Sequence, residues 1–295
     1  MSSALGIHLR RAGAGLAVQI APPAPLPLAR MVLGRAPEEV AALLPRLFNL
    51  CGAAQGHAAR LALGLPVAAG AARHEVLRDH LAKLCLRWPA LLGLPARPLP
   101  EGWQAGGPAL QDWIWGGPQP EDLTAFLGSG RGVAPLLAAL ARAFAPGEAE
   151  ARLPPLGDPM ALSAQENSPA GRVQGEALMR QAEARFGRGP LWRALGRAVD
   201  LHAMAGLAEL PAARLAGGAV SVAAARGSYA IAAQVAAGQV VALSRVTPTD
   251  HLLAPGGALA LSLAALPASK IGLAALVIDI LDPCVAVSLT EADHA

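Results

Sequence analysis

The stretch from residue 217 to 250, GGAVSVAAARGSYAIAAQVAAGQVVALSRVTPTD, constrains the fold more than any other part of the chain. It is rich in valine, its apolar residues alternate, and it carries turn signals at Gly227 and Gly238. Alternation with a period of two is typical of half-buried strands, and glycine permits tight turns between them. We therefore expect a β-hairpin or a small antiparallel meander in this stretch.

Much of the remaining chain has helical periodicity. A helix is expected to begin near Pro37, with two glutamates in its first turn, and Pro45 is expected to break or kink it. A second helical stretch follows around Cys51. Residues 72–88 have the pattern of an amphipathic helix. Its apolar stripe consists of Val76, Leu77, Leu81, Leu84 and Cys85.

The other expected elements complete an α+β fold that is mainly helical. Two short strands around a glycine turn are predicted over 5–20, followed by an extended linker over 21–27. Residues 93–120 are rich in Pro and Gly and hold three of the five tryptophans, which predicts a long irregular segment. Further helices are expected over 121–128, 133–145, 175–186, 190–206 and 258–281, with a Pro/Gly-rich break at 153–172. We expect a single domain over residues 1–295.

Composition limits the classes of function. Hydrophobic residues make up 54% of the chain and aromatic residues only 3%, so the core must be built largely from Leu, Ala and Val. No uncharged apolar run reaches the roughly 18 residues of a membrane span, despite a mean hydropathy of +0.40. No Lys/Arg cluster is interleaved with aromatic residues, so nucleic-acid binding is not expected. Three widely spaced cysteines and no signal peptide favour a reduced, cytoplasmic protein.

Familiar catalytic signatures are missing from the sequence. There is no HExxH, no GxSxG and no GxGxxG after a strand. A free cysteine is most often a small buried hydrophobe, and Cys85 fits that description because it belongs to an apolar helix stripe. Taken alone, Cys51 and Cys284 also favour this interpretation, so a role for them depends on their surroundings.

Cys51 and Cys284 each lie in a short motif, one in the first part of the chain and one close to its end. Gly34-Arg35-Ala36-Pro37 is followed by Arg46, Cys51 and Gln55, and the chain closes with Asp282-Pro283-Cys284. In this order and spacing, the segments resemble the two metal-binding signatures of [NiFe]-hydrogenase large subunits. The resemblance implies a truncated large-subunit-like fold.

Two further segments between them strengthen the resemblance. Arg226, in AAARGSYAI, matches an arginine that in the family donates to one cyanide of the iron centre. Pro248 and Thr249, in RVTPTDHLLAP, match a segment whose hydroxyl donates to the other cyanide. The resemblance places these three residues and Gln55 in the pocket around the iron ligands.

The departures from the family concern nickel. In the family, four thiolates hold nickel and two of them bridge to an iron that carries cyanide and carbonyl. Phe48 and Val287 stand where this chain would need two of the four cysteines. Two thiolates cannot supply the nickel site, so we expect iron, as Fe(CN)2(CO), and no nickel.

Cys51 and Cys284 are the iron ligands that the resemblance implies. Cys51 matches a bridging cysteine, whereas Cys284 matches a cysteine that binds only nickel in the family. Iron would be held either by both sulfurs in a shifted geometry or by Cys51 alone. The iron-carrier interpretation as a whole depends on a fold in which the sulfur near the start of the chain meets the one near its end, beside Arg226.

A chain that keeps the iron pocket and loses nickel is similar to the HupK/HoxV accessory proteins of hydrogenase maturation. This resemblance implies a scaffold, not an enzyme, that passes Fe(CN)2(CO) towards the large-subunit precursor. Its expected partners are that precursor and other maturation proteins. Two alternatives stay open: a metal-free mimic of the large subunit that binds other maturation proteins, and a small hydrogenase or redox enzyme, against which the two missing thiols argue.

Overall fold

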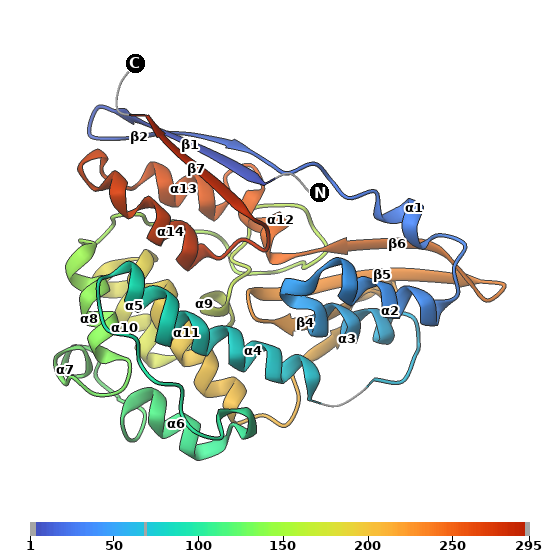
Figure 1. Ribbon diagram of the computed structural model, residues 1–295, viewed down its shortest axis with the longest axis horizontal. Helices are drawn as coiled ribbons and strands as arrows, with labels where there is room; N and C mark the ends of the chain where they lie inside the picture. Colours follow the sequence, from blue (N-terminus) through green and yellow to red (C-terminus); the bar gives the residue numbers. More distant parts are fainter. Residues whose placement is uncertain (1–3, 68–69, 293–295) are drawn as a thin grey trace.

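The computed structural model describes residues 4–67 and 70–292 of the chain. A three-stranded sheet lies along one edge of the molecule, helices fill its body, and a four-stranded antiparallel sheet projects at one end (Figure 1). Helices occupy more of the chain than strands do. The predicted mainly helical α+β fold is therefore confirmed.

The three-stranded sheet joins the two ends of the chain. Strands β1 (Leu5–Ala12) and β2 (Gly15–Ala21) form the predicted hairpin. Strand β7 (Val287–Ala292) runs parallel to β1, with Leu5 opposite Val287 (Figure 1). The sequence did not predict β7, because its partner strand β1 lies at the opposite end of the chain and leaves no local pattern. This pairing fixes the segment that follows Cys284.

The four-stranded sheet confirms the predicted meander. Its strands are β3 (Ala212–Arg214), β4 (Val220–Ala224), β5 (Gly227–Ala236) and β6 (Gln239–Val246), paired antiparallel in chain order. The β5–β6 turn has positive φ angles at Ala237 and Gly238, as the favoured two-residue hairpin turn requires. The β4–β5 turn consists of Ala225 and Arg226, which places the guanidinium at the end of the sheet that faces the helices.

Helix α11 (Pro190–Ala205) is buried along nearly its whole length and organises the helical body. Packed against it are α4 (Ala71–Ala82), α6 (Gly107–Trp115), α8 (Ala134–Ala143), α9 (Pro169–Arg172), α10 (Ala177–Phe186) and α14 (Ala274–Leu281). The remaining helices are α1 (Leu28–Val32), α2 (Pro37–Leu47), α3 (Gly52–Ala62), α5 (Trp88–Leu91), α7 (Leu123–Gly128), α12 (Pro248–Leu253) and α13 (Ala258–Ala264). Across residues 4–67 and 70–292, no helix has the length and apolar character needed to cross a bilayer.

The segment 93–120 is not irregular throughout, which corrects the prediction. Helix α6 starts at Gly107 and Pro108, and proline suits the first turn of a helix because its missing N–H needs no partner there. Its apolar face buries Ile114 and Trp115 against α11, and the Trp115 indole donates to His202 Nδ1 at 3.0 Å. The proline and glycines that indicated a loop in fact start this helix.

The predicted helix over 72–88 is continuous but contains an irregularity. A π-helical turn over Lys83–Arg87 links α4 to α5. Both ends of that turn reach the same carboxylate: Lys83 Nζ lies 2.9 Å from Asp279 Oδ1, and Arg87 Nε lies 2.9 Å from Asp279 Oδ2. Such turns often occur at functional sites, and this one ties α4 to α14.

Candidate functional site

Cys51 lies in the tight corner between α2 and α3. Helix α2 continues through Pro45 to Leu47, so the predicted break is displaced by two residues. A 3-10 turn then ends at Cys51, and α3 begins at the next residue, Gly52. A Cβ atom on Gly52 would lie 3.0 Å from the Pro45 carbonyl oxygen, and one on Gly56 would lie 2.8 Å from the Pro45 ring. The Cys-Gly pair therefore lets the two helices close around the thiol.

Replacing Gly52 by alanine tests this packing. We expect Gly52→Ala to lower the free energy of unfolding by about 1–3 kcal/mol, because a backbone carbonyl blocks the added methyl group. The matched control is Gly128→Ala in α7, where an added Cβ meets no atom within 4 Å. Urea denaturation measures both variants, and an equal stability of the two would contradict the close contact.

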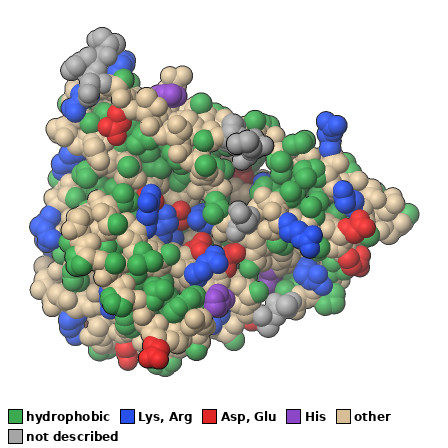
Figure 2. Space-filling view, viewed as in Figure 1, with side chains coloured by type: hydrophobic (Ala, Val, Ile, Leu, Met, Phe, Trp, Pro, Cys, Tyr) green, Lys and Arg blue, Asp and Glu red, His purple; other side chains and the backbone are tan. Residues whose placement is uncertain are grey.

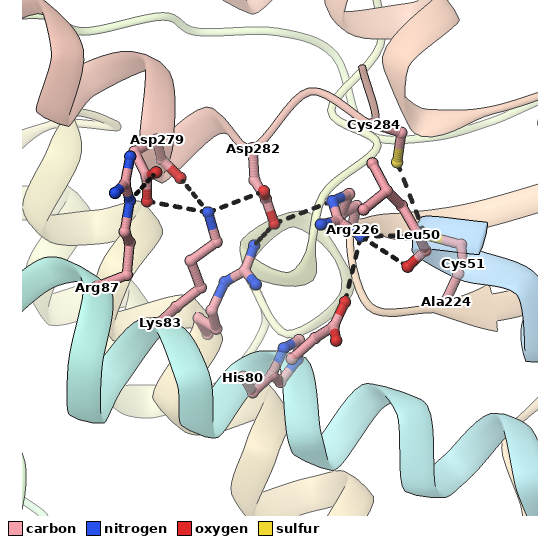
Figure 3. A network of polar contacts seen from close by, with 12 residues as sticks. Leu50, Cys51, His80, Lys83, Arg87, Ala224, Arg226, Asp279, Asp282 and Cys284 are labelled. Carbon is pink, nitrogen blue, oxygen red and sulfur yellow. Dashed lines mark hydrogen bonds and ion pairs between the residues drawn. The ribbon is translucent and has the colours of Figure 1, made fainter. Parts of the chain in front are cut away.

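Cys284 reaches the site from the opposite end of the chain. Asp282 ends α14 in the left-handed conformation, with φ of 56°, which aspartate tolerates better than most residues. The Cys284 N–H then donates to Thr249 Oγ1 at 2.8 Å, at the start of α12. Cys284 Sγ lies 3.7 Å from Cys51 Sγ (Figure 3). The structure thus brings together the two sulfurs that the sequence analysis paired, and both cysteines are free thiols.

Arg226 lies beside this sulfur pair. Its Nη1 atom is 3.2 Å from each of Cys51 Sγ, the Leu50 carbonyl oxygen and Asp79 Oδ2. Its Nε atom is 3.1 Å from Asp282 Oδ2 (Figure 3). Only 10% of the side chain is exposed, so Arg226 is not the surface residue that a position in a hairpin turn would suggest.

Asp282 gathers three cations around one buried carboxylate. Lys83 Nζ lies 2.9 Å from its Oδ1 atom, and Arg197 and Arg226 approach Oδ2 at 3.0 and 3.1 Å. Burial alone would raise the pKa of Asp282, but Arg197, Arg226 and Lys83 outweigh it and lower that pKa to about 2. In the space-filling view, acidic and basic side chains gather across the middle of the face, where α14 and the α4–α5 helix meet (Figure 2).

The pKa values of the two thiols are shifted in opposite directions. The hydrogen bond between the sulfurs raises the pKa of Cys51, and burial of Cys51 adds to this effect. The same hydrogen bond lowers the pKa of Cys284, with help from Arg226 and against the effect of burial. Cys284 is therefore the readier thiolate of the pair. By contrast, burial raises the pKa of Cys85 to about 12, so Cys85 stays a protonated core thiol as expected.

The substituted motif positions have taken up packing roles. Phe48, in place of a cysteine, lies under the guanidinium of Arg245 at 3.8 Å. Val287, in place of another, starts β7 and pairs with β1. Gln55 is buried, and its Oε1 atom has no hydrogen-bond partner within the described part of the chain. Those same residues contain no group of three or more His, Cys, Asp or Glu that could hold a metal ion.

A small cavity lies beside Arg226 and Thr249, and neither Cys51 nor Cys284 is among its lining residues. Its volume is about 20 Å³, and Arg226, Pro248, Thr249 and Asp282 are among its lining residues. That volume accommodates one water-sized group. A larger hollow of about 320 Å³ is lined by Lys83, Asp282 and residues of α14 and β7. The pocket residues predicted from the sequence therefore share one cavity, except for Gln55, which does not line it.

Two acidic residues of α4 belong to the site but were missed in the sequence. Glu75 accepts hydrogen bonds from the N–H groups of Ala53 and Ala54 at 2.9 and 3.2 Å, which fixes the first turn of α3 next to Cys51. Asp79, one turn further along, binds Arg226. Their spacing of four residues places them on one helix face, but nothing in the sequence relates that face to Cys51.

Comparisons with known proteins were made for the whole chain. No protein-family model matches it. A Rhodobacter capsulatus protein described as hydrogenase expression/formation protein HupK is 72% identical over 295 residues, which cover all of both chains.

Two solved structures of a hydrogenase share the fold. The Ni-Fe-Se hydrogenase of Desulfovibrio vulgaris Hildenborough in its reduced state matches with a TM-score of 0.57 and 13% identity, over 93% of this chain and 94% of that chain. The as-isolated oxidized state matches with a TM-score of 0.56 and 13% identity, over 92% and 94%. At this identity the match concerns the fold alone, and it confirms the predicted hydrogenase large-subunit-like architecture.

Proposed function

This chain belongs to the HupK family of hydrogenase expression/formation proteins, and we propose from this premise that it carries the iron fragment Fe(CN)2(CO) while a hydrogenase active site is assembled. The fragment would be its cargo, received from the proteins that make it and passed to the hydrogenase large-subunit precursor. The observation that carries the proposal is the meeting of Cys51 and Cys284, 233 residues apart, at 3.7 Å beside Arg226.

The sulfur separation suits two ligands of one metal ion. Metal–sulfur bonds are about 2.3 Å long, so two sulfurs less than about 4 Å apart can both reach one metal ion. Cys51 and Cys284 already stand within that distance. Of the two arrangements that the sequence left open, this separation favours iron held by both sulfurs. Soft thiolate ligands also suit iron that carries cyanide and carbonyl.

The neighbouring donors suit cyanide. Thr249 Oγ1 accepts the Cys284 N–H at 2.8 Å, and its own O–H, which lies against the Cys284 side chain, could donate to a ligand bound there. A guanidinium carries N–H donors on three nitrogens, so Arg226 has donors beyond its Nη1 and Nε contacts that could serve an anionic ligand. Charge-assisted donors of this kind bind anions more strongly than neutral donors do. Both side chains also line the cavity of about 20 Å³.

The residues have distinct roles in this proposal. Cys51 and Cys284 grip the iron, Arg226 and Thr249 orient its cyanides, and Asp282 holds Arg226 in place. The positions of Phe48 and Val287 provide no sulfur, so nickel is not bound and hydrogen is not activated. Without nickel and the other two thiolates, the site around the iron is less complete than the family's full metal centre, which suits a carrier that must release its cargo.

Anaerobic purification tests the proposal directly. We expect the protein, isolated from cells that contain the cofactor-making machinery, to carry iron without nickel and to show infrared bands of metal-bound cyanide and carbonyl. Metal analysis and infrared spectroscopy on one sample give both results. A protein without iron or these bands that still co-purifies with other maturation proteins would overturn the carrier proposal in favour of the metal-free mimic. Hydrogen–dye exchange activity would overturn it in favour of an enzyme.

A further inference from the structure

Arg226 is held by a buried clamp that lies outside the sulfur site. We infer that Arg172 and Asp200 are positioning residues, which fix the turn that carries Arg226 and so aim its guanidinium at the cargo. This inference rests on the proposed function for the identity of the cargo. The clamp itself consists of contacts within the chain.

The guanidinium of Arg172 grips the backbone on both sides of Arg226. Its Nη2 atom donates to the Ala224 carbonyl oxygen at 2.9 Å, and its Nη1 atom donates to the Gly227 carbonyl oxygen at 3.3 Å. These two carbonyls belong to the residues that close the β4–β5 turn. One side chain therefore sets the separation and direction of the two strand ends.

Asp200 in turn orients Arg172. Its carboxylate accepts from Arg172 Nε at 2.8 Å and from Nη2 at 3.2 Å, a bidentate pairing that fixes the plane of the guanidinium. His80 Nε2 lies 2.7 Å from the same carboxylate, and the side chains of Asp200 and His80 are both fully buried. The clamp thus connects α11 and α4, through α9, to the turn of the sheet.

The β4–β5 turn needs outside support. Two-residue hairpin turns are most stable when the first or both central residues have positive φ, which matches the twist of the strands. Neither Ala225 nor Arg226 has a positive φ. The left-handed residue is instead Gly227, with φ of 145°, and a Cβ there would lie 2.4 Å from Asn167 Oδ1.

Asn167 supplies a second support at the same turn. Its amide donates to the Ser228 carbonyl oxygen at 2.9 Å, and its Oδ1 accepts the Ser228 N–H at 2.6 Å. Asn167 precedes α9, the helix that carries Arg172. The segment around α9 therefore holds the turn at three backbone positions, and Arg226 projects from that fixed frame towards Cys51.

Two substitutions of Arg172 test the inference. Arg172→Gln removes both the positive charge and the branched guanidinium. Arg172→Lys keeps the positive charge near Asp200, but a single ammonium group cannot donate to both the Ala224 and the Gly227 carbonyl oxygens. We expect both variants to carry several-fold less iron than the wild-type protein and to shift its cyanide infrared bands. The matched control is Arg185→Gln, an exposed arginine on α10 that donates to Thr124, and it should leave occupancy and bands unchanged.

A readout without cargo separates this inference from the proposed function. In cargo-free protein, we expect the rate of Cys51 alkylation by iodoacetamide, followed by peptide mass spectrometry, to differ several-fold between Arg172→Lys and the wild type, because Arg226 would no longer lie against the sulfur. Wild-type alkylation rates and unshifted bands in a folded Arg172→Lys protein would overturn the inference. If the wild-type protein lacks bands but the alkylation difference appears, the clamp stands and the carrier proposal fails.

Discussion

Cys51→Ala is expected to remove essentially all bound iron while leaving the fold intact. Cys51 supplies one of the two sulfurs in the site, and the remaining thiol of Cys284 cannot chelate a metal ion by itself. Alanine fills most of the space of a small buried side chain, so the corner between α2 and α3 should persist. Metal analysis of anaerobically purified protein measures the loss, and disappearance of the cyanide and carbonyl bands accompanies it.

Two other cysteine variants complete the experiment. Cys284→Ala should lose iron to the same degree if both sulfurs bind it, and should keep part of it if Cys51 binds alone. Cys85→Ala is the matched control, because Cys85 is fully buried in the core. It should cost stability without changing bound iron. Retention of iron in Cys51→Ala, or its loss in Cys85→Ala alone, would show that the assigned ligands are wrong.

Asp282→Ala is expected to cost about 3–5 kcal/mol of unfolding free energy, the usual penalty for breaking a buried ion pair from one side. The substitution leaves Arg197, Arg226 and Lys83 without their common carboxylate, and the side chain of Arg197 is only 3% exposed. Guanidinium denaturation measures the change. The loss of an anchor for Arg226 should also weaken the retention of iron.

The matched control for this variant is Glu121→Ala, which removes an exposed carboxylate. It should change stability by no more than about 0.5 kcal/mol. A similarly small effect of Asp282→Ala would mean that the three cations find other partners or water, and that Asp282 does not hold the site together. Asp282→Asn, which keeps the shape but not the charge, separates the electrostatic contribution from packing.

Local pattern predicted most of the secondary structure. The alternating valines of β4–β6 and the apolar stripe of α4 are repeated within a few residues, so the sequence reveals them directly. Strand β7 and helix α6 escaped prediction for two different reasons. The partner of β7 is at the far end of the chain, and α6 begins with the glycine and proline that usually mark loops.

The residues of the candidate site also fall into two groups, those that a local motif identifies and those that it does not. Cys51, Cys284, Arg226 and Thr249 could be proposed because each sits in a short motif whose residues are adjacent in the chain. Gln55 was proposed on the same basis, but it does not line the small cavity.

The supporting residues could not be proposed from motifs. Glu75, Asp79, Arg172 and Asp200 act through single contacts between elements that are remote in sequence. No spacing rule connects such residues.

The sequence by itself determined which chemical groups this protein can bring to a metal: two thiols, one guanidinium and one hydroxyl. Side-chain chemistry is fixed by residue identity and needs no fold. Only the tertiary structure decided that these groups meet. The pairing of β7 with β1, the α2–α3 corner closed on glycine, and the carboxylate of Asp282 bring the two sulfurs to 3.7 Å. Distances across a folded chain depend on packing between elements that are remote in sequence, and no single segment of the sequence determines that packing.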